Sequence, residues 1–196
     1  MGSLYDLLKF LHVLSFVFMS IPLFNLIVVN ERALIGPSFH FYADRYMENI
    51  IQRGALRCYV FQSTAFVSGI LLLLVGPLGL EALWTNWVVL TKVFLLFTLM
   101  GLLSYVHFNL QPKIEALIST VSSDANVPEG LFAELKPLRM RRKRLATVCL
   151  FVVITTIILG LQVYAPFRPV LTAVLIVSAG LFSWRVSKSV IRFGWM

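Results

Sequence analysis

Two ionisable side chains stand deep inside apolar stretches of the sequence, where they could do chemistry. His12 and Lys92 each lie about eight residues into such a stretch, or about 12 Å along a helix. An ionisable group inside a membrane costs several kcal/mol unless it is paired or hydrated, so both are functional candidates. A neutral imidazole can bind haem iron or shuttle protons, and a desolvated lysine can exchange a proton or meet a carboxylate. His12 is therefore the candidate metal ligand and Lys92 the candidate catalytic residue.

Each of these residues also has a purely structural interpretation. Lys92 can snorkel outward to the water interface, and His12 can donate a hydrogen bond to a neighbouring carbonyl. His12, Ser15, Met19 and Pro22 follow one another at three- and four-residue steps, which places them on one helical stripe. We predict that this stripe faces other helices.

His107 and His40 form a second candidate group for binding a cofactor. His107 lies about 22 Å along its helix from Lys92, so these two residues cannot share a site. A pair of His40 and His107 could ligate a haem or a metal if the loop that carries His40 comes close. The alternative is an interfacial histidine without a cofactor, because positions near the interface are already hydrated.

The composition indicates a membrane protein. Of the 196 residues, 59% are hydrophobic and 13% are charged, whereas a soluble domain is about a quarter charged. The net charge of +8 collects at the ends of the apolar stretches, which favours anionic lipid head groups over nucleic acid as its partner. The sequence has no HExxH, Walker A or nucleophile-elbow motif, so hydrolases and nucleotide-driven pumps have no support.

Five apolar stretches are each long enough to cross about 30 Å of hydrocarbon, which needs about 20 helical residues. They lack period-2 alternation, so we predict helices and not a β-barrel. The whole chain is then a single all-α membrane domain, a bundle of five transmembrane helices. The predicted spans are 4–29, 56–75, 84–110, 145–164 and 169–186. The third helix either ends at Gln111-Pro112 or continues past the proline into 113–119.

The basic residues predict the orientation of the bundle. Segments 31–55 and 112–144 and the C-terminal tail carry nearly all of them, while the opposite side holds only Lys9 and Arg168. The positive-inside rule therefore places the N-terminus outside and the C-terminus in the cytoplasm. We interpret the run Arg139–Arg144 as a topology anchor that contacts lipid.

Two of the predicted cytoplasmic segments have distinct compositions. Glu31–Arg53 mixes aromatic with charged residues, which is typical of an amphipathic helix lying in the membrane interface. Ser119–Glu129 is polar and rich in turn-forming residues, which predicts a loop.

The first helix resembles that of a group of small bacterial membrane proteins. Lys9-Phe10-Leu11-His12-Val13 matches the K-x-L-H-(V/I) opening of the copper-resistance D-type proteins and of the membrane-bound J-type protoporphyrinogen oxidases. In that oxidase family a first-helix histidine and a third-helix lysine are tied to haem b and porphyrin chemistry. His12 and Lys92 stand at the matching places, and Tyr105–His107 resembles the polar end of the third helix. The similarity covers about residues 4–113.

The resemblance implies a multi-pass protein of the bacterial inner membrane, with haem b as its cofactor. The fifth helix and the long cytoplasmic segments go beyond a minimal four-helix member of that group. Our first expectation is therefore an integral membrane subunit of a larger bacterial complex, structural or electron-transferring, with or without one b-type haem on His12. Its partners would be the lipid bilayer and other membrane subunits. The alternative is a haem-dependent enzyme resembling protoporphyrinogen oxidase that uses His12 and Lys92.

Overall fold

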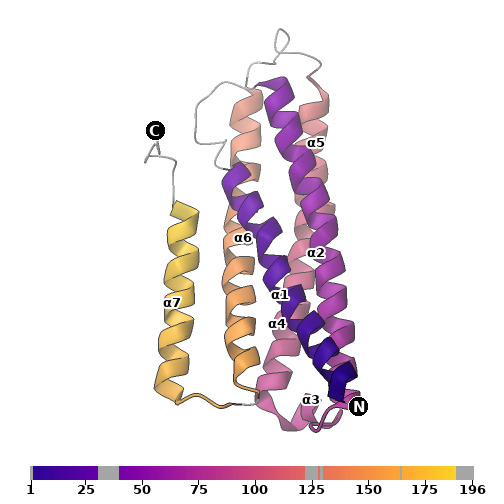
Figure 1. Cartoon of the computed structure of the whole chain (residues 1–196). Coiled ribbons are helices and arrows are strands. Elements are labelled where there is room, and N and C mark those ends of the chain that lie inside the picture. Colours follow the sequence, from indigo (N-terminus) through magenta and orange to yellow (C-terminus); the bar gives the residue numbers. More distant parts are fainter. Residues whose placement is uncertain (1, 31–39, 122–127, 129, 164, 189–196) are drawn as a thin grey trace, which may run out of the picture.

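The computed structural model of the chain is a bundle of helices that run alternately up and down (Figure 1). It describes residues 2–30, 40–121, 128, 130–163 and 165–188. The long helices are α1 (Gly2–Asn30), α2 (Phe41–Val75), α4 (Trp87–Tyr105), α6 (Leu131–Leu161) and α7 (Pro169–Lys188). The short elements are α3 (Ala82–Thr85), the π-helix η2 (Val106–Leu110) and α5 (Gln111–Ser119).

Within the described residues, five helical stretches are long and apolar enough to cross a membrane. They correspond to the five predicted spans, and the same residues contain no β-strand. The predicted all-α fold with five membrane-crossing helices is therefore confirmed.

Two helices begin much earlier than the predicted spans that they contain. The predicted second span starts at residue 56, but α2 already begins at Phe41 and runs unbroken for 35 residues. The described part of Glu31–Arg53 thus forms about the first third of α2 and not a separate interfacial helix; residues 31–39 lie outside the described residues. α6 similarly begins at Leu131 and includes Pro137, whereas the fourth span was predicted from 145. The early part of α2 buries Asp44 and Glu48, and the early part of α6 buries Arg139, which pairs with both. These added turns are therefore stabilised by contacts between the helices and not by the membrane interface.

Of the two alternatives predicted for the end of the third span, the structure has the longer one, in which the helix continues past Pro112. α4 passes into the π-helix η2, and α5 follows directly, with Pro112 in its first turn. A proline at this position costs little, because its missing N–H has no required partner in a first turn. Helical structure therefore extends from Trp87 to Ser119, and the predicted loop 119–129 starts at its end, although most of that loop lies outside the described residues.

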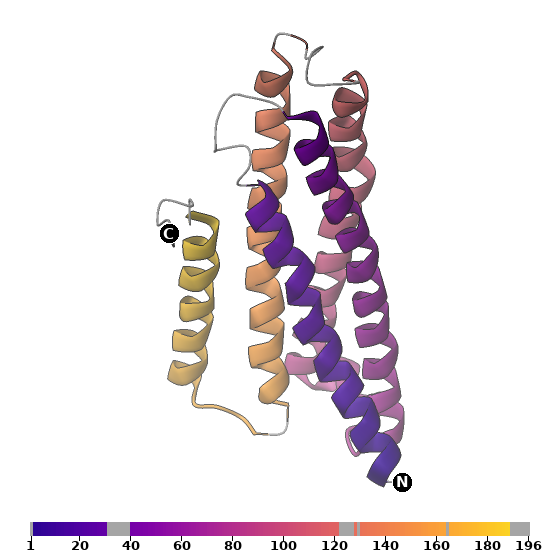
Figure 2. The same cartoon turned by 45° about the horizontal axis from the view of Figure 1, so that its top comes forward.

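α6 occupies the centre of the bundle. It packs against α1, α4, α5 and α7, while α1 also packs along α2. α7 stands at the edge beside α6, and both views show it apart from α2 and α4 (Figures 1 and 2). The main core combines buried side chains of four helices, among them Met19, Ala65, Leu99 and Leu150.

The first turns of α2 and α6 and the whole of α5 extend beyond α1 and α7 at one end of the bundle (Figure 1). We call this the basic end, because it carries Arg139–Arg144. A second apolar cluster, which includes Phe41, Ile114 and Leu135, holds the three helices together there.

Candidate functional site

α1 places the His12 imidazole against the inner face of α2. Its Nδ1 atom lies 2.9 Å from the backbone oxygen of Ala65 and 3.1 Å from Oγ of Ser68. Because a backbone oxygen only accepts, Nδ1 carries the proton and donates it. Among the described residues, no protein group forms a hydrogen bond with Nε2. His12 therefore keeps an unused lone pair on Nε2 in a half-buried position.

Small residues on α2 make room for this ring. A Cβ atom added at Gly69 would lie only 3.1 Å from Cε1 of His12, and Ala65 is completely buried beneath it. Small residues of this kind let membrane helices approach closely. On the other side, the Phe16 ring meets the imidazole edge-on at 5.3 Å. The ring is thus fixed by a hydrogen bond, a glycine and an aromatic neighbour.

Lys92 is half-buried and directs its ammonium group toward α6. Its Nζ atom sits against α6, where a Cβ atom on Gly160 would lie 3.4 Å from it. Its positive charge is close enough to act on the His12 ring. α1 and α4 are separated over much of their length by α2 and α6, which each pack against both helices. The structure therefore brings the two intramembrane candidates within electrostatic range without direct packing of their helices.

His107 and His40 are not brought together. His107 belongs to η2, and its ring packs edge-on against Tyr59 of α2 at 5.8 Å. His40 is exposed just before α2, where its backbone N–H donates to Oδ2 of Asp44 at 2.9 Å. Tyr59 is about 28 Å along α2 from His40. The structure therefore does not place these two histidines as ligands of one haem or metal.

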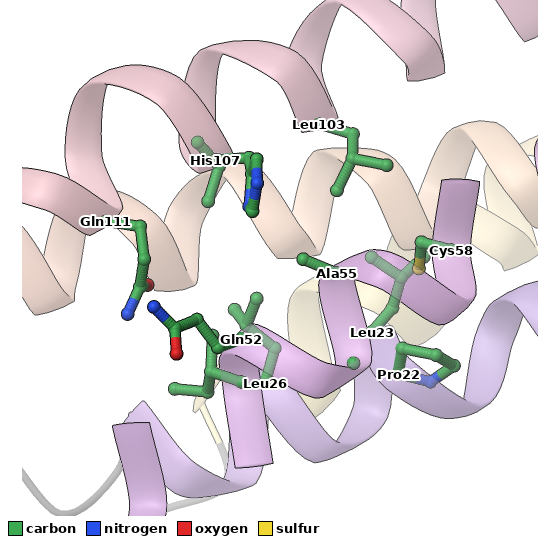
Figure 3. A pocket seen from close by; sticks show the side chains of 12 residues that line it. Pro22, Leu23, Leu26, Gln52, Ala55, Cys58, Leu103, His107 and Gln111 are labelled. Carbon is green, nitrogen blue, oxygen red and sulfur yellow. The ribbon is translucent and has the colours of Figure 1, made fainter. Parts of the chain in front are cut away.

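His107 instead borders a small internal cavity of about 30 Å³. Figure 3 shows its ring hanging into the cavity from η2, with the amides of Gln52 and Gln111 near one end and Cys58 near the other. The Nδ1 atom of His107 is buried and has no hydrogen-bond partner. At this volume the cavity has no room for a porphyrin.

A buried cluster of ion pairs at the basic end was missed by sequence reasoning. Arg139 donates from Nη1 to Oδ1 of Asp44 at 2.6 Å and from Nε to Oε1 of Glu48 at 3.1 Å. Arg142 donates from Nη1 to Oε2 of Glu48 at 2.6 Å and to Oε1 of Gln111 at 2.6 Å. The cluster joins α2, α5 and α6 through charge-assisted hydrogen bonds, which are the strongest kind in proteins.

This cluster corrects the interpretation of the basic run as a lipid contact. Arg139, Arg142 and Lys143 are all at most 3% exposed, and only Arg141 and Arg144 face outward. A usable signal was present in the sequence. Asp44 and Glu48 stand four residues apart and therefore share one helical face. The two buried arginines stand three apart, so they also share one face.

Comparison with models of known protein families, with characterised proteins and with solved structures finds no match for this chain.

Proposed function

We propose that this chain is an electron-transferring membrane subunit of a larger bacterial inner-membrane complex, and that His12 ligates one b-type haem through Nε2. The observation that carries the proposal is the hydrogen bonding of His12. A metal-ligating histidine usually donates its other ring N–H to a carbonyl or carboxylate, which fixes the tautomer and the ring orientation. Nδ1 of His12 donates to Ala65 in this way, and Nε2 has no described protein partner.

The donor chemistry at this position suits a haem. An imidazole is a common axial ligand, and its burial tunes the potential of the iron. Lys92 adds a positive charge nearby, which would attract the carboxylates of a haem. When bound, the haem would supply the redox chemistry, while the chain would supply the ligand, its orientation and its apolar surroundings.

A structural subunit without a cofactor is the second candidate. The hydrogen bond from His12 to Ala65 also ties α1 to α2, which is a sufficient role for a histidine inside a bundle. Among the five membrane-crossing helices, α7 has the smallest share of buried residues. It therefore offers the most apolar surface to lipid or to a neighbouring subunit.

An enzyme resembling protoporphyrinogen oxidase is supported by the proximity of Lys92 to His12. That reaction needs room for a porphyrin substrate. The oxidase would have to hold this substrate in addition to its haem, and the two cavities, of about 30 Å³ each, lie toward the basic end and do not include His12 in their lining.

An absorbance spectrum of gently purified protein, oxidised and then reduced with dithionite, tests the proposal. We expect a Soret band that shifts on reduction, is lost in His12→Ala and is kept in His107→Ala, the matched control. A band that survives His12→Ala would reject His12 as the ligand. A folded wild-type protein without any band, even after added haemin, would leave the structural subunit as the better account.

A further inference from the structure

Two internal cavities lie next to each other in the half of the bundle toward the basic end. The first is the cavity bordered by His107. The second also holds about 30 Å³, and Gln62, Arg142 and Cys149 are among its lining residues. Both cavities are lined by Cys58 and by apolar side chains of α1 and α4, so they are separated at most by shared side chains.

Each cavity is lined by one residue with a buried polar atom that has no protein partner. Nδ1 of His107 and Oε1 of Gln62 are buried, and neither has a hydrogen bond. A buried polar group without a partner costs about 1–3 kcal/mol, so such atoms are normally satisfied by ordered water. About 10–15 Å³ is enough for one water molecule, and each cavity offers more than that. Each cavity therefore has the space for a water molecule, and its mostly apolar lining includes one residue with a buried polar atom that lacks a protein partner.

These cavities connect polar groups at two levels of the bundle. At the basic end, Gln111 lines the first cavity and donates from Nε2 to Glu48 at 3.3 Å, while Arg142 lines the second. In the other direction, Gln62 stands one helical turn before Ala65, whose backbone oxygen accepts from His12. Polar groups thus follow one another along the inner face of α2, from the ion-pair cluster to Gln62, one helical turn before Ala65.

The local backbone also sets His107 apart. It lies in a five-residue π-helix inserted between two α-helices. A π-turn of this kind is rare, and it is found frequently at functional sites because it re-aims side chains that a regular helix would place elsewhere. Here it accompanies an imidazole that hangs into a cavity (Figure 3).

We propose that the two cavities hold water and form a proton path from the basic end toward His12, with His107 as its proton-exchanging group. A proton from cavity water binds one ring nitrogen of His107, and the proton on the other nitrogen leaves to the next water. The ring ends neutral in its other tautomer and must flip before it passes a second proton in the same direction; no oxidant or reductant is needed. The other ionisable groups around the cavities are Cys58, Tyr59, Cys149 and Arg142, with Glu48 behind Gln111.

The chain offers a clean test, because it contains only three histidines. Protein labelled with ¹⁵N-histidine and reconstituted in lipid gives one ring signature for each of them in solid-state NMR, assigned by single substitutions. Magnetisation transferred from water should reach exposed His40 and half-buried His107 at similarly short mixing times. It should reach His12 later.

Gln62→Leu should slow the transfer from water to His12 several-fold while leaving His107 unchanged. Thr64→Val is the matched control, because the Thr64 hydroxyl is on the same helix and bonds its own backbone at Val60. The path is rejected if His107 receives no water magnetisation, or if both variants change His12 equally. The measurement needs no haem, so it stands or falls independently of the proposed function.

Discussion

Arg142 and Glu48 meet through two parallel hydrogen bonds, from Nη1 to Oε2 at 2.6 Å and from Nη2 to Oε1 at 3.0 Å. The two residues are 94 positions apart in the sequence, and the Arg142 side chain is completely buried. This fork-to-fork geometry aligns α6 with α2 in a way that no apolar contact could, because both partners are planar and directional. The basic residues of this end therefore serve the packing of the bundle as well as its orientation.

Removing one member of this buried pair should be costly. We expect Glu48→Ala to lower the free energy of unfolding by about 3–5 kcal/mol, because it removes the carboxylate that binds Arg142 in two places and one of the two that bind Arg139. Unfolding in mixed micelles titrated with dodecyl sulfate measures the effect. Glu115→Ala is the control: its exposed bond from Gln52 should be worth less than about 1 kcal/mol.

Replacing both members together distinguishes an unpaired charge from a lost contact. The double variant Glu48→Met with Arg142→Met should recover most of the stability that Glu48→Ala loses, since well-packed apolar residues often match a buried ion pair. A double variant as unstable as the single one would show that the pair itself, and not the uncompensated charge, holds α2 to α6.

The glycine beneath His12 should tolerate no larger side chain. Gly69→Val would place its first side-chain carbon 3.1 Å from the imidazole and push the ring away from Ala65 and Ser68. We expect a loss of about 1–3 kcal/mol from overpacking, measured by thermal unfolding. Gly101→Ala is the control, because nothing lies within 4 Å of the added atom; it should be neutral or slightly stabilising. Equal effects of the two substitutions would contradict the tight packing described here.

We expect Lys92 to destabilise the fold. Among the described residues Lys92 has no hydrogen bond or ion pair, and an ionisable group inside a span is costly unless it is paired or hydrated. Lys92→Met should therefore raise the thermal stability, whereas Lys113→Met, at an exposed position, should leave it unchanged. A destabilised Lys92→Met protein would instead mean that the ammonium group is a structural tie.

The asymmetry of basic residues sets the orientation expected in the cell. A green fluorescent protein fused after Met196 should fluoresce, because it folds in the cytoplasm, and alkaline phosphatase fused there should be inactive. Alkaline phosphatase inserted after Pro166, between α6 and α7, should be active. The reverse pattern at both positions would show that the bundle has the opposite orientation, with the ion-pair cluster on the outer side.

The architecture was readable from the sequence because each span must satisfy its backbone internally and be about 20 residues long. The helix ends were less readable. Hydropathy marks where lipid ends, but a helix continues as long as partners bury its polar side chains, as Asp44 and Glu48 show in the early turns of α2.

The same limit explains the uneven prediction of the sites. His12 and Lys92 stood out because an ionisable residue in an apolar stretch is conspicuous on its own. The roles of Arg139 and Arg142 depend on partners about 95 residues away, and a basic run near a span end has a sufficient explanation in topology. The π-helix at His107 has no sequence signature that we could have used.

Imidazole rescue tests the central claim, that Nε2 of residue 12 is a haem ligand, most directly. His12→Gly leaves a space beside Gly69 that free imidazole can occupy. We predict that this variant loses the Soret band of the wild type and regains it when imidazole is added, while His107→Gly keeps its band throughout. A wild-type protein without a haem band, or a His12→Gly variant that keeps one before imidazole is added, would contradict the claim.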